Sequence, residues 1–128
     1  MKDSGQSPKL EGLRVLVVED EALIALQLED MLTELGCAVV GPASRVAQAL
    51  QLLDGEKVDA AVLDLNIAGE LVYPVADALA HRGLPYIFAT GYGVEGLTER
   101  YRDRPVLEKP FPRRDLRKAM LDSLQRAG

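Results

Sequence analysis

The chain has little cysteine, no long apolar run and no excess of positive charge, and each lack excludes a class of protein. Its one cysteine, Cys37, cannot form an internal disulfide and favours a reducing compartment. The formal net charge of −5 lacks the basic footprint of a nucleic-acid-binding domain. Apolar runs such as residues 22–26 are too short to cross a bilayer. We therefore expect a cytoplasmic protein that binds neither nucleic acid nor membrane.

What the chain does have is the composition of an ordinary globular domain. Of its 128 residues, 48% are hydrophobic and 27% are charged, which excludes disorder for the bulk of the chain. Residues 1–11 are polar and without periodicity, so they are predicted to form a flexible N-terminal tail rather than a signal peptide. Residues 12–128 are predicted to form one domain.

Two hydrophobic periods alternate along that domain. Short apolar runs predict buried strands at residues 14–18, 37–40, 58–63, 85–89 and 105–108, the second of them ended by Gly41-Pro42. Helical spacing predicts helices at residues 21–35, 44–55, 72–83 and 112–125, with a short or weak fourth helix within 91–104, which is rich in glycine.

This alternation predicts an α/β fold of the doubly wound, flavodoxin-like type. Strand and helix follow one another five times, which favours a five-stranded parallel sheet with helices on both faces. Right-handed crossovers and five strands favour the order 2-1-3-4-5. In such sheets a ligand binds at the carboxyl ends of the strands, beside strands 1 and 3.

Polar residues follow the carboxyl ends of the predicted strands, where that order would gather them. They are Glu19 and Asp20 after the first strand, Asp64 and Asn66 after the third, Thr90 after the fourth, and Lys109 after the fifth. Three clustered carboxylates repel one another, and a Mg²⁺ ion with oxygen ligands and a phosphoryl group would relieve that repulsion. An aspartate can accept a phosphoryl group covalently, and the cation and Lys109 would stabilise its charge.

In order and position, these residues resemble the receiver domain of bacterial two-component response regulators. The resemblance covers residues 13–124, and it includes Lys109-Pro110-Phe111. It implies that Asp64 is the phosphoacceptor, supplied by a histidine kinase or a histidine phosphotransferase. It also implies that Thr90 is the switch hydroxyl and that Lys109 contacts the phosphate, with a cis peptide bond before Pro110.

The resemblance further implies a metal site and a subgroup. Mg²⁺ would be held by Asp20, Asp64, Glu19 and the backbone carbonyl of Asn66. The run at residues 88–91 is similar to Phe-Ala-Thr-Gly-x-Tyr receivers, which are often stand-alone and paired with HWE or HisKA2 histidine kinases, although glycine stands in the final position here.

The position three residues before Lys109 also departs from many receivers. Val106 stands there in place of the aromatic switch residue, which is typical of the same subgroup. A rotating ring therefore cannot carry the signal at this position. We expect residues 91–104, which follow Thr90, to respond to phosphorylation instead.

Three functions are compatible with these residues. The first is a single-domain response regulator that signals by protein–protein contact or phosphorelay, with no enzymatic activity beyond its own phosphoryl transfer and autodephosphorylation. The second is a Mg²⁺-dependent phosphatase with an aspartyl nucleophile, which Leu65-Asn66 after Asp64 disfavours because no general acid stands there. The third is a receiver fold that binds a partner without taking phosphate. Phosphoryl labelling and turnover of a phosphate ester separate the three.

Overall fold

A five-stranded parallel sheet forms the centre of the computed structural model, which describes residues 10–91 and 97–127. The strand order is β2-β1-β3-β6-β7, which confirms the predicted order 2-1-3-4-5 when the sheet strands are counted along the chain. The strands are β1 (Arg14–Val18), β2 (Ala38–Ala43), β3 (Ala60–Leu63), β6 (Tyr86–Thr90) and β7 (Val106–Glu108).

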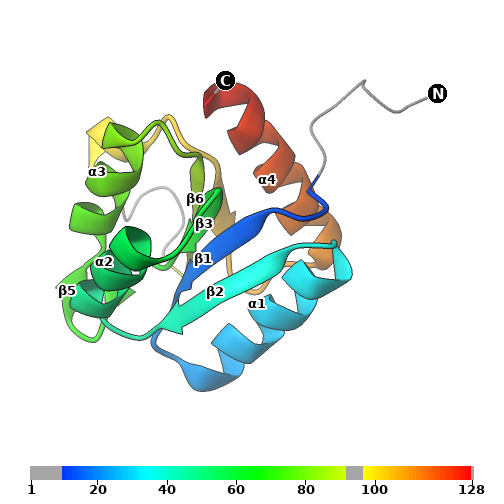
Figure 1. Cartoon of the computed structure of the whole chain (residues 1–128), viewed down its shortest axis with the longest axis horizontal. Coiled ribbons are helices and arrows are strands. Elements are labelled where there is room, and N and C mark those ends of the chain that lie inside the picture. Colours follow the sequence, from blue (N-terminus) through cyan, green and yellow to red (C-terminus); the bar gives the residue numbers. More distant parts are fainter. Residues whose placement is uncertain (1–9, 92–96, 128) are drawn as a thin grey trace.

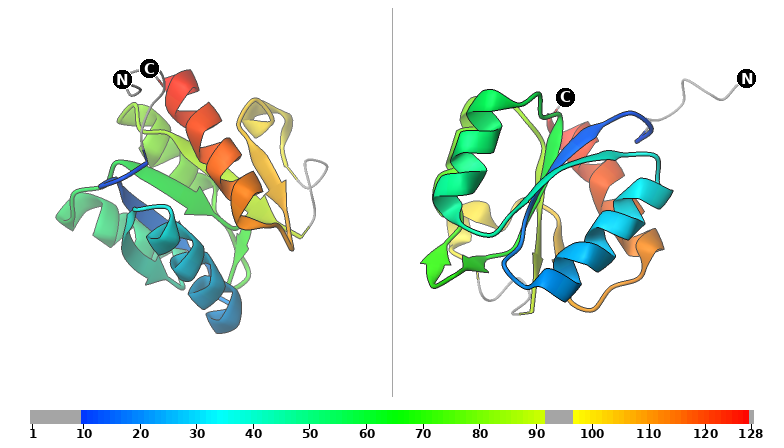
Figure 2. Two further views of the ribbon diagram at one scale, coloured as in Figure 1. Left: turned by 90° about the vertical axis from the view of Figure 1, so that its right-hand side faces the viewer. Right: turned by 60° about the horizontal axis from the view of Figure 1, so that its bottom comes forward.

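Helices cover both faces of the sheet. As Figures 1 and 2 show, α1 and α4 lie on one face, and α2 and α3 lie on the other. The helices are α1 (Ala22–Glu34), α2 (Val46–Gly55), α3 (Tyr73–His81) and α4 (Arg113–Ala127). Pro74 occupies the first turn of α3, where its missing N–H costs no helical hydrogen bond. No helix in residues 10–91 and 97–127 has the length and apolarity needed to cross a membrane.

The inner strands β1, β3 and β6 are buried on both faces, so alternate side chains enter two separate cores. In β1, Leu16 and Val18 face the core beneath α2 and α3, whereas Val15 and Val17 face the core beneath α1 and α4. This is why the inner strands are apolar throughout instead of alternating between apolar and polar residues. Cys37 belongs to the second core as a small buried residue, and burial raises the pKa of its thiol.

Two local features differ from the sequence prediction. The strand β2 does not end at Gly41 but continues to Ala43, because Gly41 adopts a φ of 99° and lets the strand bend beside β1. A two-stranded hairpin, β4 (Asn66–Ile67) and β5 (Glu70–Leu71), follows β3 and was not predicted. Its turn uses positive φ at both Ala68 and Gly69.

The predicted tail and the predicted weak helix lie partly outside the described residues. Residues 1–9 and 92–96 are not described. Within the rest of 91–104 the chain forms one short 3₁₀ helix, η3 (Glu99–Tyr101). The Tyr101 ring stacks on Tyr73 of α3 at 4.1 Å between centroids, and its hydroxyl donates a hydrogen bond to Asp77. These contacts fasten η3 to α3.

Candidate functional site

The carboxyl ends of four neighbouring strands bring the predicted site residues to one edge of the sheet. The backbone N–H of Asp64 donates to Val18 O at 3.0 Å, which sets the end of β3 beside the end of β1. On the other side, the N–H of Lys109 donates to Thr90 O at 2.9 Å. Parallel pairing therefore places side chains from distant parts of the sequence around one pocket.

Lys109 links two of the carboxylates. Its ammonium Nζ lies 2.5 Å from Glu19 Oε1 and 3.2 Å from Asp64 Oδ2. The Glu19 side chain is only 2% exposed, so a cation beside it is required to offset the cost of burying its charge. Burial lowers the pKa of Lys109, but the hydrogen bond to Glu19 and the charges of both carboxylates outweigh it and raise that pKa. The peptide bond between Lys109 and Pro110 is cis, as the resemblance implies.

The Asp64 carboxylate is held from two sides in a poorly solvated position. Its Oδ1 accepts a hydrogen bond from the N–H of Leu65 at 2.8 Å, and its Oδ2 faces Lys109. Burial and the nearby negative charge of Glu19 raise the pKa of Asp64 to about 6, and Lys109 only partly opposes that rise. The carboxylate is thus less stable in its ionised form than a solvated aspartate.

Asp20 interacts with the hairpin, a contact that the sequence did not indicate. Its Oδ2 accepts a hydrogen bond from the N–H of Ala68 at 2.9 Å, while the N–H of Gly69 donates to Asn66 Oδ1 at 3.1 Å. The only local signal for this turn is Ala68-Gly69, because glycine tolerates positive φ. The hairpin thereby orients the exposed Asp20 toward the pocket.

The three carboxylates form an oxygen-rich cluster that could hold a metal ion. One oxygen each from Glu19, Asp20 and Asp64 lies within 4.8 Å of the others. An adjoining cavity of about 460 Å³ is lined by Asp20, Glu21, Asp64, Asn66, Gly91 and Lys109. A donor set made only of oxygen atoms suits a hard divalent cation such as Mg²⁺. Glu21 and Gly91 are the lining residues that the sequence argument did not select.

Thr90 and Val106 lie on the neighbouring strands β6 and β7. Thr90 is fully buried at the carboxyl end of β6. Val106 is half-buried at the start of β7 and packs against the core beneath α2 and α3. The β6–β7 register pairs Phe88 with Val106 and Thr90 with Glu108.

Comparison with known proteins places this arrangement in a family. The response regulator receiver domain family matches residues 15–121. The transcriptional regulatory protein PdtaR of Mycobacterium tuberculosis is 35% identical over 107 residues, which are 80% of this chain and 52% of the relative. The phyllosphere-induced regulator PhyR of Methylorubrum extorquens is 34% identical over 101 residues, which are 76% of this chain and 38% of the relative.

Solved structures agree with the sequence comparison. The solution structure of SdrG from Sphingomonas melonis Fr1 superposes with a TM-score of 0.81 at 43% identity, covering 91% of this chain and 99% of that one. The receiver domain of PhyR from Erythrobacter litoralis gives 0.77 at 30% identity, with coverage of 91% and 92%. The chain spans about half, or less, of the length of the curated relatives it matches. By its sequence, its fold and the residues at its strand ends, the chain belongs to the response regulator receiver domain family.

Proposed function

We propose that this receiver domain, residues 12–128, accepts a phosphoryl group on Asp64 from a histidine kinase or a histidine phosphotransferase. The observation that carries the proposal is the contact of Asp64 with Lys109 beside two further carboxylates, at the mouth of an open pocket. In the proposed site Mg²⁺ is bound by Glu19, Asp20, Asp64 and the backbone carbonyl of Asn66. The donor set supports this ion because every ligand is an oxygen atom.

The proposed transfer is a displacement at phosphorus. A carboxylate oxygen of Asp64 attacks the phosphoryl group of a phosphohistidine, and the P–O bond forms as the P–N bond breaks. The electron pair of the P–N bond stays on the imidazole nitrogen. When bound, Mg²⁺ supplies positive charge to the transferring phosphoryl oxygens. Lys109 shares that role, since its raised pKa keeps the ammonium protonated throughout the neutral range.

The proposed output is a change of contact with a partner protein, or onward transfer in a phosphorelay. In this proposal the Thr90 hydroxyl donates a hydrogen bond to the phosphoryl oxygen and alters the chain around it. The sequence 88–91 favours a kinase of the HWE or HisKA2 type as the donor. Domains of this family are signalling domains and are not in general enzymes. An assay with a generic phosphate ester and Mg²⁺ distinguishes the proposed signalling function from a phosphatase, because only a phosphatase would turn the ester over.

The first prediction is that Asp64→Asn abolishes phosphorylation. With acetyl phosphate and Mg²⁺, the wild-type protein should gain the mass of one phosphoryl group in intact-mass spectrometry. The variant should gain none, because the amide is not a nucleophile for this transfer. Asp122→Asn, which changes an exposed carboxylate on α4, is the matched control and should label like the wild type. Labelling of Asp64→Asn at the wild-type level would refute the assignment.

The second prediction concerns the metal. Asp20→Asn should weaken Mg²⁺ binding at least about tenfold, because a charged ligand is lost from the cluster. The amide also relieves carboxylate repulsion, so stability in metal-free buffer should not fall. Titration followed by amide NMR shifts measures the affinity. Glu21→Gln, which changes an exposed carboxylate lining the same cavity, should leave the affinity within about twofold. Equal affinities for Asp20→Asn and wild type would contradict the proposed ligand set.

A further inference from the structure

Asp20 is held differently from the other two carboxylates of the cluster. Glu19 and Asp64 both contact the ammonium of Lys109, at 2.5 Å and 3.2 Å, whereas Asp20 is exposed. One oxygen from each of the three lies within 4.8 Å of the others, and like charges at that separation repel. Repulsion drives an exposed carboxylate outward into solvent, so Asp20 needs a separate contact to stay in the cluster.

A turn at the tip of the β4–β5 hairpin supplies that contact. The backbone N–H of Ala68 donates to Asp20 Oδ2 at 2.9 Å. A hydrogen bond with a charged acceptor is stronger than one between neutral groups. The second residue of the turn, Gly69, donates its N–H to Asn66 Oδ1 at 3.1 Å, which closes the turn on the strand before it.

The backbone of this turn is unusual. In residues 10–91 and 97–127, Ala68 is the only residue other than glycine with a positive φ, which is 52°. A Cβ disfavours this conformation, so two-residue hairpin turns of this kind favour asparagine, aspartate or glycine. A hairpin with two residues in each strand is too short to impose it alone. The bond with Asp20 therefore stabilises the turn, and the turn in return fixes Asp20.

The hairpin is also anchored to the core. Ile67, the residue before Ala68, is fully buried in the core beneath α2 and α3. At the base of the hairpin the N–H of Val72 donates to Leu65 O at 2.9 Å, and both residues are buried. The Ala68 N–H thus has a defined position relative to the sheet, as a group that orients a ligand side chain requires.

We propose that Ala68 is a positioning residue for the proposed Mg²⁺ site. Its backbone N–H keeps the Asp20 carboxylate beside Glu19 and Asp64 before the ion is bound. Less side-chain freedom is then lost on binding, and hydrogen bonds to ligand groups commonly raise the affinity of a metal site. The inference rests on the proposed function, because it takes Asp20 to be a ligand.

Two substitutions separate the N–H of Ala68 from its side chain. Ala68→Pro removes the donor, and the proline φ of about −65° cannot match the observed 52°. Ile67 is already in a strand, which a following proline tolerates, and position 68 is exposed. We expect Ala68→Pro to bind Mg²⁺ about threefold to tenfold more weakly than the wild type. Ala68→Gly keeps the donor and tolerates positive φ, so its affinity should stay within about twofold. Titration followed by amide NMR shifts measures both.

A double-variant cycle shows whether Ala68 acts through Asp20. In the Asp20→Ala background no carboxylate is left to position, so adding Ala68→Pro should change the Mg²⁺ affinity less than about twofold. Hydrogen exchange of the metal-free protein tests the bond itself. Asp20→Ala should speed exchange of the Ala68 amide at least about threefold. It should speed exchange of Val72 less, since that N–H is bonded to Leu65 within the hairpin.

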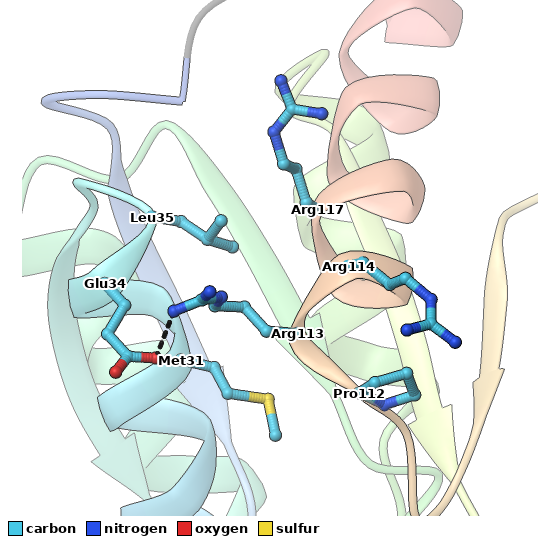
Figure 3. A pocket seen from close by; sticks show the side chains of 7 residues that line it. All are labelled: Met31, Glu34, Leu35, Pro112, Arg113, Arg114 and Arg117. Carbon is cyan, nitrogen blue, oxygen red and sulfur yellow. Dashed lines mark hydrogen bonds and ion pairs between the residues drawn. The ribbon is translucent and has the colours of Figure 1, made fainter.

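A control removes a contact at the far end of α1, the helix that begins two residues after Asp20. Figure 3 shows Glu34 of α1 paired with Arg113 of α4, at 2.8 Å. The 13 residues of α1 span about 20 Å, which exceeds the Debye length of about 10 Å at 0.1 M salt. Glu34→Gln should therefore leave the Mg²⁺ affinity within about twofold.

The inference is overturned if Ala68→Pro binds Mg²⁺ like the wild type, or if Ala68→Gly or Glu34→Gln weakens binding as much as Ala68→Pro. It is also overturned if the loss persists in full in the Asp20→Ala background, or if Asp20→Ala leaves exchange of the Ala68 amide unchanged. Failure of the proposed ligand set looks different, because Asp20→Asn would then bind Mg²⁺ like the wild type. If Asp20→Asn weakens binding and Ala68→Pro does not, only the positioning role is wrong.

Discussion

Replacing Lys109 with methionine should destabilise the protein by about 3 kcal/mol, because it leaves a buried carboxylate without its cation. The Glu19 side chain is 2% exposed and that of Lys109 is 13% exposed, so solvent cannot replace the lost partner. Methionine retains the unbranched apolar stem, which limits the loss of packing. Urea unfolding at pH 7 in EDTA measures the change in the free energy of unfolding.

A double variant separates the lost pairing from the lost side chain. Glu19→Gln combined with Lys109→Met removes both charges and should recover most of the stability, since the cost arises from an unpaired charge.

The pH dependence of the stability that Lys109 contributes has a defined sign. The pKa of Lys109 is raised in the folded state, so its contribution is complete at neutral pH and is lost only as pH rises past that pKa. A loss below about 1 kcal/mol in the single variant would show that water reaches Glu19.

Asp64→Asn should raise the stability of the metal-free protein at pH 7 by about 2 kcal/mol. The pKa of Asp64 is raised from 3.8 to about 6 by burial and by the charge of Glu19, so its ionised form opposes folding. The amide keeps an oxygen that can accept the hydrogen bond from the Leu65 N–H. Loss of the contact with Lys109 offsets part of the gain, and Lys109 keeps its pairing with Glu19.

This gain should depend on pH and on Mg²⁺. As pH falls from about 6 toward 4, folded Asp64 takes up a proton that the unfolded chain does not, so the wild type gains stability and the advantage of the variant shrinks. Mg²⁺ should instead stabilise the wild type more than the variant, because the ion binds the native carboxylates. Unfolding at pH 7 and pH 4.5, with and without Mg²⁺, measures both trends. A variant less stable than the wild type at pH 7 in EDTA would contradict the raised pKa.

The sequence alone determined the layout of the fold. Apolar runs such as residues 14–18 and 60–63 form strands that are buried on both faces of the sheet. Such strands can be predicted from the sequence because each run of apolar residues lies within one short segment. Helical periods are equally local, so the helix around Leu28 and Leu32 was predicted within one or two residues of its bounds. Handedness and strand number then limited the order of strands to the one observed.

The sequence also determined which residues lie at the carboxyl ends of the strands, where the candidate site is found. Glu19, Asp64, Thr90 and Lys109 each stand at or just after the end of a strand, and parallel pairing must bring such positions together. Their assigned roles in phosphoryl transfer stay predictions until labelling tests them.

Only the tertiary structure decided how those residues interact. The pairing of Lys109 with Glu19 joins positions 90 apart, and the hydrogen bond from Ala68 to Asp20 joins positions 48 apart. Neither contact has a periodic signal, because each depends on the distance between chain segments and not on local pattern. The bend of β2 at Gly41 likewise depends on its pairing with the neighbouring strand β1. The pKa of Asp64 follows from these contacts as well, since desolvation and nearby charge exist only after folding has removed water and fixed the distances.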